Sequence, residues 1–224
     1  MDFEARKFGD IQYVIKFPKN YKSNEKYPVI ISLHGAGGRG TNITAFYKNN
    51  LFDASNNIPD FPFVCVVPLC HGNTWFDIYE QLKNLVVNIV SSDYADKDRI
   101  YLMGVSMGGY AAWQLAMSMP EFFAGLVAMC GGGMYWNGAR LTNVPVWAFH
   151  GAKDKVVLPE ESEKMVNSVL KHGGEARLTI LPENEHNVWD DVYSDPEVYK
   201  WMLEHKNKNE RAINDIFTRS DLYG

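Results

Sequence analysis

One pentapeptide constrains the fold of this chain more than any other segment: Gly104-Val105-Ser106-Met107-Gly108. It ends a strand-like run, residues 99–105, and begins a run of helix-forming residues. A strand that reverses sharply into a helix strains its central residue, and side chains at the flanking positions would collide, so glycine is needed there. The sequence therefore predicts a nucleophile elbow, with the hydroxyl of Ser106 exposed at the tip of a strand.

A glycine-rich loop follows an earlier apolar run, in the segment Leu33-His34-Gly35-Ala36-Gly37-Gly38. Glycines let the backbone approach a reacting group closely, and loops of this form supply an N–H group to an oxyanion. The other donor is expected at the N-terminus of the helix after the serine. We predict an oxyanion hole built from the N–H groups of Met107 and Ala36, with Gly37 as the alternative to Ala36.

An acid and a histidine follow Ser106 in the order Ser, Asp, His. Asp154 comes just after the apolar run 146–151, and His186 follows the run 178–181. An imidazole is suited to take the serine proton and return it to a leaving group, and a carboxylate would hold the ring in the right tautomer. We predict Ser106, Asp154 and His186 as the catalytic residues.

Together with His186-Asn187-Val188-Trp189, these segments resemble the α/β-hydrolase superfamily over residues 10–205. Within it they look like the phospholipase/carboxylesterase and predicted-peptidase group, which is related to dienelactone hydrolases and feruloyl esterases. The resemblance implies a metal-independent serine hydrolase with Ser106, Asp154 and His186 as its triad. It also implies the α/β-hydrolase fold.

The hydrophobic pattern leads to the same fold class. Seven segments predict strands, several of them continuous apolar runs: residues 11–17, 28–34, 62–68, 99–105, 124–130, 145–150 and 176–181. Such runs are typical of a parallel sheet that is buried on both faces. Helical stretches between them, the clearest at Phe76–Ser92, predict a doubly wound, mostly parallel sheet with helices on both faces. Ligands of such sheets bind beyond the carboxyl ends of the strands, where all three triad candidates lie.

The length of 224 residues and the 46% hydrophobic content suit one compact domain with a full core. We expect a single domain over residues 1–224, with a core at about 10–205 and a C-terminal extension at 206–224. In the extension, Ile213, Ile216 and Phe217 share one helical face. It could dock on the domain, dock on a second subunit to give a homodimer, or fray.

Charge and cysteine content narrow the partners and the compartment. The net charge is −5, and no cluster of Lys and Arg is dense enough for a phosphate backbone, so nucleic acid is not expected as a partner. No apolar run approaches the roughly 20 residues that span a bilayer, and the charged N-terminus lacks the apolar core of a signal peptide. Three cysteines without metal-type spacing favour free thiols. We expect a cytoplasmic protein without a membrane span.

A dinucleotide-binding loop and a metal site are two alternatives to the nucleophile elbow. Residues 35–40 fit the pattern G-x-G-x-x-G, but the next strand-like run, 63–70, lacks the terminal acid that would hold a ribose. A metal site of His34, His71 and His186 lacks a ligand-spacing signature. We expect no cofactor and no metal, and we expect His34 and His150, in His-Gly turns at strand ends, to hold loops.

Residues on loops after the strands suggest substrate contacts. Trp75, Trp136, Trp189 and His71 are predicted near the cleft, where aromatic rings could stack a phenolic or sugar ring; core packing is the alternative for each tryptophan. The loop at 131–144 is too short for a cap of several helices, so we expect an open cleft that admits small-molecule or polymeric esters.

The function that we predict is a serine carboxylesterase-type enzyme. It would cleave carboxylic esters, short-chain or aryl and sugar esters, through an acyl-enzyme intermediate. Two alternatives stay open: a peptidase with the same triad, and a catalytically silent hydrolase-fold binding protein. Fold alone does not decide between them.

Overall fold

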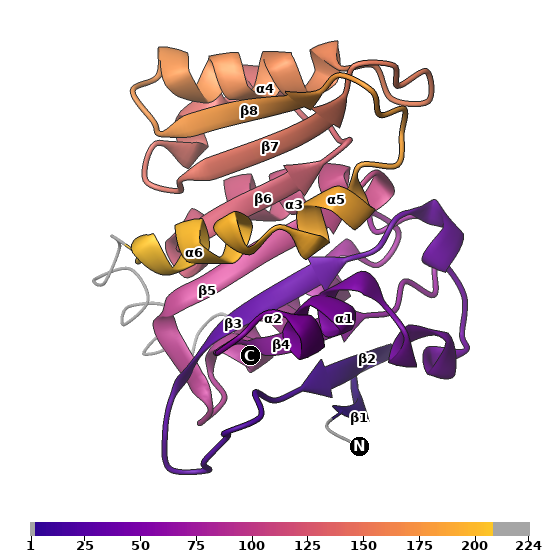
Figure 1. The fold of residues 1–224 in the computed structure, drawn as a ribbon, viewed down its shortest axis with the longest axis vertical. Coiled ribbons are helices and arrows are strands. Elements are labelled where there is room, and N and C mark those ends of the chain that lie inside the picture. Colours follow the sequence, from indigo (N-terminus) through magenta and orange to yellow (C-terminus); the bar gives the residue numbers. More distant parts are fainter. Residues whose placement is uncertain (1–2, 208–224) are drawn as a thin grey trace.

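The structure is a computed structural model, and it describes residues 3–207 (Figure 1). Most of the predicted C-terminal extension, with its apolar helical face, lies outside the described residues. Within residues 3–207, eight strands form one sheet in the order β1-β2-β4-β3-β5-β6-β7-β8. The strands are β1 (Phe3–Phe8), β2 (Ile11–Lys16), β3 (Tyr27–Leu33), β4 (Val64–Pro68), β5 (Ala95–Val105), β6 (Gly125–Met129), β7 (Val146–Gly151) and β8 (Ala176–Leu181).

Most neighbouring strands are parallel. Strand β1 pairs with β2 and β2 pairs with β4 in antiparallel fashion, whereas the pairs from β4 across to β8 are parallel. All seven predicted strands are present. Strand β1 was not predicted because its sequence, FEARKF, is charged and mostly exposed. Charged side chains suit an edge strand, since they discourage pairing with another chain.

Helices cover both faces of the sheet, which confirms the predicted doubly wound architecture (Figure 1). Helices α2, α3 and α4 pack with one apolar cluster, and α1, α5 and α6 pack with the other. The α-helices are α1 (Asn50–Asn57), α2 (Tyr79–Val90), α3 (Met107–Ser118), α4 (Glu160–Lys171), α5 (Trp189–Ser194) and α6 (Pro196–Glu204). The short 3₁₀ helices are η1 (Ala36–Gly38), η2 (Ile43–Tyr47), η3 (Pro120–Phe122) and η4 (Tyr135–Leu141).

Helix α2 shows how the pattern of apolar residues fixes the packing. Leu82, Leu85, Val86 and Ile89 recur at three- and four-residue spacing and are fully buried against the sheet. Each such side chain contributes roughly 1.5–3 kcal/mol by leaving water. The predicted helix at 76–92 is therefore confirmed, with a later start and an earlier end.

The loops that follow β3, β5, β7 and β8 meet at the carboxyl edge of the parallel strands, on the right in Figure 1. The loop at 131–144 folds into η4 and packs on α4, where the hydroxyl of Ser168 donates to the carbonyl of Tyr135. No large cap covers the edge of the sheet in the part of the chain that the structure describes, as predicted.

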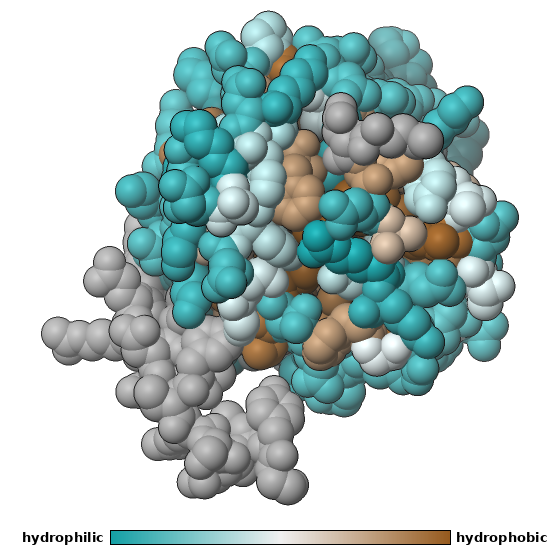
Figure 2. Space-filling model, turned by 90° about the horizontal axis from the view of Figure 1, so that it is seen from below, coloured by the Kyte–Doolittle hydropathy of each residue, from teal (hydrophilic) through white to brown (hydrophobic). Residues whose placement is uncertain are grey.

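Figure 2 shows the face seen from the β1 side: hydrophilic residues cover most of it, and apolar residues reach the surface toward its middle. Among residues 3–207, no helix combines the length and the apolar character that crossing a bilayer requires.

Candidate active site

The turn at Ser106 has the strained geometry that the sequence predicts. Ser106 joins β5 to α3 with a φ of 53° and a ψ of −115°. Such a positive φ is uncommon for a residue with a side chain and persists only where the surroundings enforce it. A Cβ on Gly104 would collide with the backbone of Gly108, and a Cβ on Gly108 would lie 2.7 Å from the carbonyl oxygen of His34. Both glycines are therefore required by close packing around the elbow.

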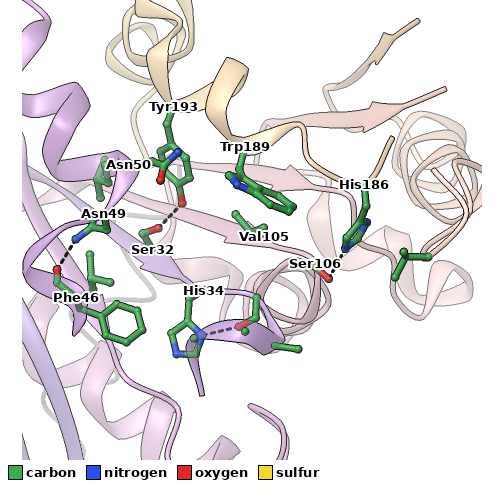
Figure 3. Close-up of a pocket in the computed structure, with 17 residues that line it drawn as sticks. Ser32, His34, Phe46, Asn49, Asn50, Val105, Ser106, His186, Trp189 and Tyr193 are labelled. Atoms are coloured by element: carbon green, nitrogen blue, oxygen red, sulfur yellow. Dashed lines mark hydrogen bonds between the residues drawn. The ribbon is translucent and has the colours of Figure 1, made fainter. Parts of the chain in front are cut away.

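The structure brings the three predicted catalytic residues into one hydrogen-bonded chain. The Nε2 atom of His186 lies 2.8 Å from the hydroxyl oxygen of Ser106 (Figure 3), and its Nδ1 atom lies 2.7 Å from Oδ2 of Asp154. Because a carboxylate only accepts hydrogen bonds, Nδ1 carries the proton. The Nε2 atom is then free to accept the proton of the serine hydroxyl.

Asp154 is buried, with 3% of its surface exposed. Burial by itself would raise the pKa of this carboxyl group, but the hydrogen bonds from His186 and from the N–H groups of Val157 and Val156 hold the pKa below its ordinary value. The group therefore stays ionised at neutral pH. A fixed negative charge behind the imidazole stabilises the imidazolium that proton transfer creates.

The predicted oxyanion donors belong to the start of α3 and to the loop after β3. Met107 is the first residue of α3, and its N–H is one of the groups at a helix N-terminus without a partner inside the helix. Gly35 passes over the elbow, since a Cβ built on it would lie 3.5 Å from the Cβ of Ser106. Ala36 and Gly37 follow in η1 and line the same cavity as Ser106.

A cavity of about 460 Å³ opens beside Ser106 (Figure 3). Phe46, Leu51, Val67, Val105 and Trp189 give it mainly apolar walls. Polar groups lie deeper: the hydroxyl oxygens of Ser32 and Tyr193 are 2.7 Å apart, and both residues line the cavity.

The outer wall of the cavity comes from α1 and α5. The side chain of Asn50 on α1 donates a hydrogen bond to the carboxylate of Asp190 on α5. Among these wall and floor residues, Trp189 was predicted as a substrate contact and the others were not. The one available signal was Ser32, which is a polar residue inside a buried strand.

A family model for esterases matches residues 8–187. This chain belongs to that esterase family. Its sequence is 25% identical to poly(3-hydroxyalkanoate) depolymerase C of Paucimonas lemoignei over 138 residues, which make up 55% of this chain and 32% of that protein. It is 21% identical to a protein named probable feruloyl esterase C from Aspergillus oryzae over 174 residues, 76% of this chain and 64% of that protein. The chain thus spans less than two thirds of the length of either relative.

Solved structures of esterases share the fold. A thermostable esterase superposes with a TM-score of 0.82 and 28% identity, over 92% of this chain and 64% of that one. Est1E from Butyrivibrio proteoclasticus superposes with a TM-score of 0.68 and 16% identity, over 91% of this chain and 98% of that one. The α/β-hydrolase fold predicted from the sequence is confirmed by these neighbours.

In this member of the esterase family, one of the four predicted substrate contacts lines the cavity. Trp189 does so, with its ring edge-to-face to His186 at 5.9 Å between centroids. Trp75 is fully buried and donates from Nε1 to the carbonyl of His34, so it supports the glycine-rich loop that begins there. Trp136 is 70% exposed on η4, and His71 is exposed; neither is among the residues that line the cavity.

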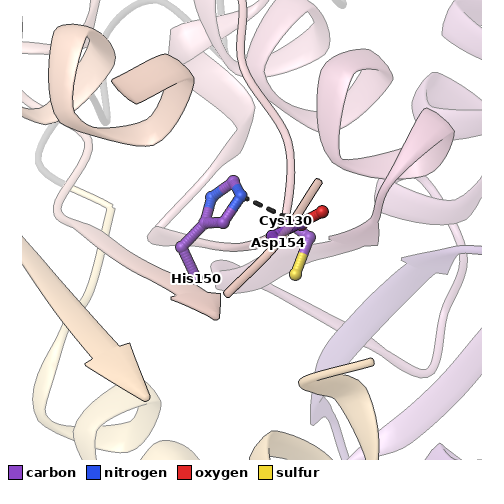
Figure 4. Close-up of side chains that lie close together, drawn as sticks. All are labelled: Cys130, His150 and Asp154. Carbon is purple, nitrogen blue, oxygen red and sulfur yellow. Dashed lines mark ion pairs between the residues drawn. The ribbon is translucent and has the colours of Figure 1, made fainter. Parts of the chain in front are cut away.

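The described part of the chain holds one group of side chains with metal-ligand chemistry: Cys130, His150 and Asp154, with ligand atoms within 4.8 Å of one another (Figure 4). Burial raises the pKa of the Cys130 thiol to about 12, so the thiolate that binds metals is disfavoured. The carboxylate of Asp154 already accepts a hydrogen bond from Nδ1 of His186. The group is therefore suited to hydrogen bonding behind the triad.

Proposed function

We propose that this chain is a serine carboxylesterase that works through an acyl-enzyme intermediate. The observation that carries the proposal is the chain of hydrogen bonds from Ser106 through His186 to Asp154, at the mouth of a cavity of about 460 Å³. Membership of the esterase family supports the same activity.

In the proposed reaction, the hydroxyl oxygen of Ser106 attacks the ester carbonyl while Nε2 of His186 takes its proton. The N–H groups of Met107 and Ala36, or of Gly37 in place of Ala36, stabilise the oxyanion. The imidazolium then gives its proton to the departing alcohol, which leaves the acyl group on the serine. Water repeats these steps on the acyl-enzyme and releases the acid.

We propose short-chain and aryl esters as the substrates. The mainly apolar cavity with a polar inner end fits an acyl or aryl group of limited size. The names of the relatives from Aspergillus oryzae and Paucimonas lemoignei, a feruloyl esterase and a polyester depolymerase, point to ester bonds of both aryl and polymeric substrates. Sugar esters lose support, because Trp75 and Trp136, two of the tryptophans predicted to stack a sugar or phenolic ring, do not line the cavity.

A cytoplasmic location is part of the same proposal. Cys65, Cys70 and Cys130 are free and buried, and buried free thiols suit a reducing compartment.

The decisive experiment combines a substrate panel with active-site labelling. The panel contains p-nitrophenyl esters of increasing acyl length, hydroxycinnamate esters, acetylated sugars and aminoacyl anilides. We expect turnover of the short-chain and aryl esters, and labelling by a fluorophosphonate at Ser106 that Ser106→Ala abolishes. Faster cleavage of the anilides would favour the peptidase, and neither turnover nor labelling would favour a binding protein.

A further inference from the structure

His150, at the end of β7, is fully buried directly behind the catalytic acid (Figure 4). Its Nε2 atom lies 2.9 Å from the carbonyl oxygen of Val157 and 3.2 Å from Oδ2 of Asp154. Its Nδ1 atom lies 2.7 Å from the hydroxyl oxygen of Ser162, which in turn lies 2.9 Å from the carbonyl oxygen of Gly131. Both ring nitrogens therefore have polar partners in a site that excludes water.

These partners determine where the ring carries a proton. A carbonyl oxygen and a carboxylate oxygen only accept hydrogen bonds, so the Nε2 atom of His150 must be an N–H. The Nδ1 atom faces Ser162, whose single hydroxyl proton can go to the carbonyl oxygen of Gly131 or to the ring, but not to both. Whichever of the two accepts it, the N–H at Nε2 points toward the turn that carries Asp154.

A second contact connects the two ends of that turn. The N–H of Val157 donates to Oδ1 of Asp154, and the carbonyl of the same residue accepts from His150. By binding the carbonyl of Val157, the side chain of His150 therefore also fixes the carboxylate that accepts from the N–H of Val157. The N–H edge of His150 adds positive potential beside Oδ2, the oxygen that accepts from His186.

We propose that His150 is a positioning residue for the catalytic acid. It locks the turn from Asp154 to Val157 through the carbonyl of Val157, and so aims Oδ2 of Asp154 at His186. The N–H of His150 also attracts part of the negative charge of the Asp154 carboxylate, which limits how strongly Asp154 stabilises the imidazolium form of His186. Ser162 on α4 keeps the ring of His150 in the required orientation.

The inference deepens the proposed function, and its kinetic readouts depend on that function. The titratable groups that face Asp154 are His186, His150, Cys130 and Tyr110. Burial raises the pKa of the Cys130 thiol and of the Tyr110 phenol, so neither group changes charge between pH 5 and 8. Neither of these two groups therefore sets the acid-side midpoint of a pH profile in this range.

The test uses two variants at one position. His150→Phe keeps a ring but removes the N–H, and His150→Gln keeps an N–H near the position of Nε2. We expect His150→Phe to lower kcat roughly 10- to 100-fold, the size of effect that misplacing a catalytic group by about 1 Å produces. KM should change less than twofold, and the acid-side midpoint of the kcat/KM profile should rise because the carboxylate loses a neighbouring N–H. His150→Gln should restore most of kcat.

His205→Phe is the matched control. His205 also uses both ring nitrogens, toward the carbonyl of Trp201 and the carboxylate of Glu175, and it does not line the cavity. Its loss should lower the free energy of unfolding and leave the pH profile unchanged. If His150→Phe behaves like His205→Phe, with kcat and the acid-side midpoint as in the wild type, His150 only packs and the proposal is wrong.

A measurement on the wild-type protein needs neither a folded variant nor a substrate. Nitrogen-15 NMR of labelled histidines reports which ring nitrogen of His150 carries a proton. We expect a protonated Nε2, and an unprotonated Nε2 would overturn the proposal. Failure of the proposed function would look different, because the wild type would then show neither ester turnover nor fluorophosphonate labelling while His150 still held its proton at Nε2.

Discussion

The Nδ1 atom of His34 donates a hydrogen bond of 2.7 Å to the carbonyl oxygen of Gly35, while its Nε2 atom accepts from the N–H of Cys70 at 3.0 Å. These two contacts require a neutral ring with its proton on Nδ1. In a trans peptide the C=O and the next N–H point in opposite directions. Holding the carbonyl of Gly35 therefore turns the N–H of Ala36 away from His34, as an oxyanion donor requires.

This neutral histidine predicts a pH dependence of stability. Burial lowers the pKa of His34, against the opposing effect of its bond to Gly35, so the unfolded chain binds more protons at mildly acidic pH than the native protein does. Its contribution to stability should be complete above the unfolded pKa of about 6.5 and should be lost as the pH falls below that value. Thermal unfolding between pH 7.5 and 5 measures the effect. A His34→Gln variant should show a flatter dependence, and an equally steep one would contradict the assignment.

Ser106 and His186 should act as a unit. Ser106→Ala and His186→Ala should each lower kcat by roughly 10⁶-fold, and the double variant should be about as inactive as either single one. The reason is that the Ser106 hydroxyl attacks efficiently only when His186 takes its proton. Active-site titration of the preparations excludes contamination by wild-type enzyme, and additive losses in the double variant would argue against a shared proton transfer.

Asp154→Asn tests the choice of the acid. The amide can donate a proton toward Nδ1 of His186, which favours the wrong tautomer, and kcat should fall by about 10⁴-fold with the fold intact. Circular dichroism and thermal unfolding serve as the control for folding. Near wild-type turnover would mean that another carboxylate is the acid.

Gly104→Ala should unfold or strongly destabilise the protein. The added Cβ would collide with the backbone of Gly108 and lie 2.7 Å from the Cβ of Ala112, and such overpacking costs about 3 kcal/mol or more where backbone must move. Urea unfolding measures the change. Gly37→Ala is the matched control for stability, since a Cβ there would meet no atom within 4 Å.

The hydroxyl pair at the inner end of the cavity predicts a preference for acyl groups that carry a polar end. One hydroxyl of the Ser32–Tyr193 pair donates to the other, which leaves one proton for a ligand. Tyr193→Phe and Ser32→Ala should therefore lower the ratio of kcat/KM for 4-hydroxyphenyl-substituted over phenyl-substituted esters, by roughly three- to tenfold for one lost hydrogen bond. Equal losses for both esters would show that the pair only supports the wall.

Seven of the eight described strands could be predicted, and so could the three residues that meet in one hydrogen-bonded chain, because both depend on local signals. Buried parallel strands are continuous apolar runs, and the elbow needs glycines that the chain provides on either side of Ser106. Strand β1 was missed because its charged residues carry no such signal. Its partner is β2, and pairing across a short turn forms it.

Apart from Trp189, the walls of the cavity could not be predicted, for a different reason. Asn49 and Tyr193 lie far apart in the chain, and helix docking brings them together. The tryptophans show the same limit. Trp75 is buried, and its N–H donates to the carbonyl of His34, whereas Trp136 is exposed. No local sequence pattern distinguishes these two positions.

The bond between Asn50 and Asp190 joins two helices across 140 positions of the chain, and neither helix carries a member of the triad. The three predicted catalytic residues lie on turns that follow strands of the sheet, whereas the outer wall of the cavity depends on how α1 and α5 pack against each other. The hydrogen-bonded chain and the shape of the cavity thus depend on different parts of the molecule. Substitutions along α1, and along α5 beyond Trp189, whose ring packs against His186, can therefore widen or narrow the cavity and leave the hydrogen bonds from Ser106 to Asp154 in place.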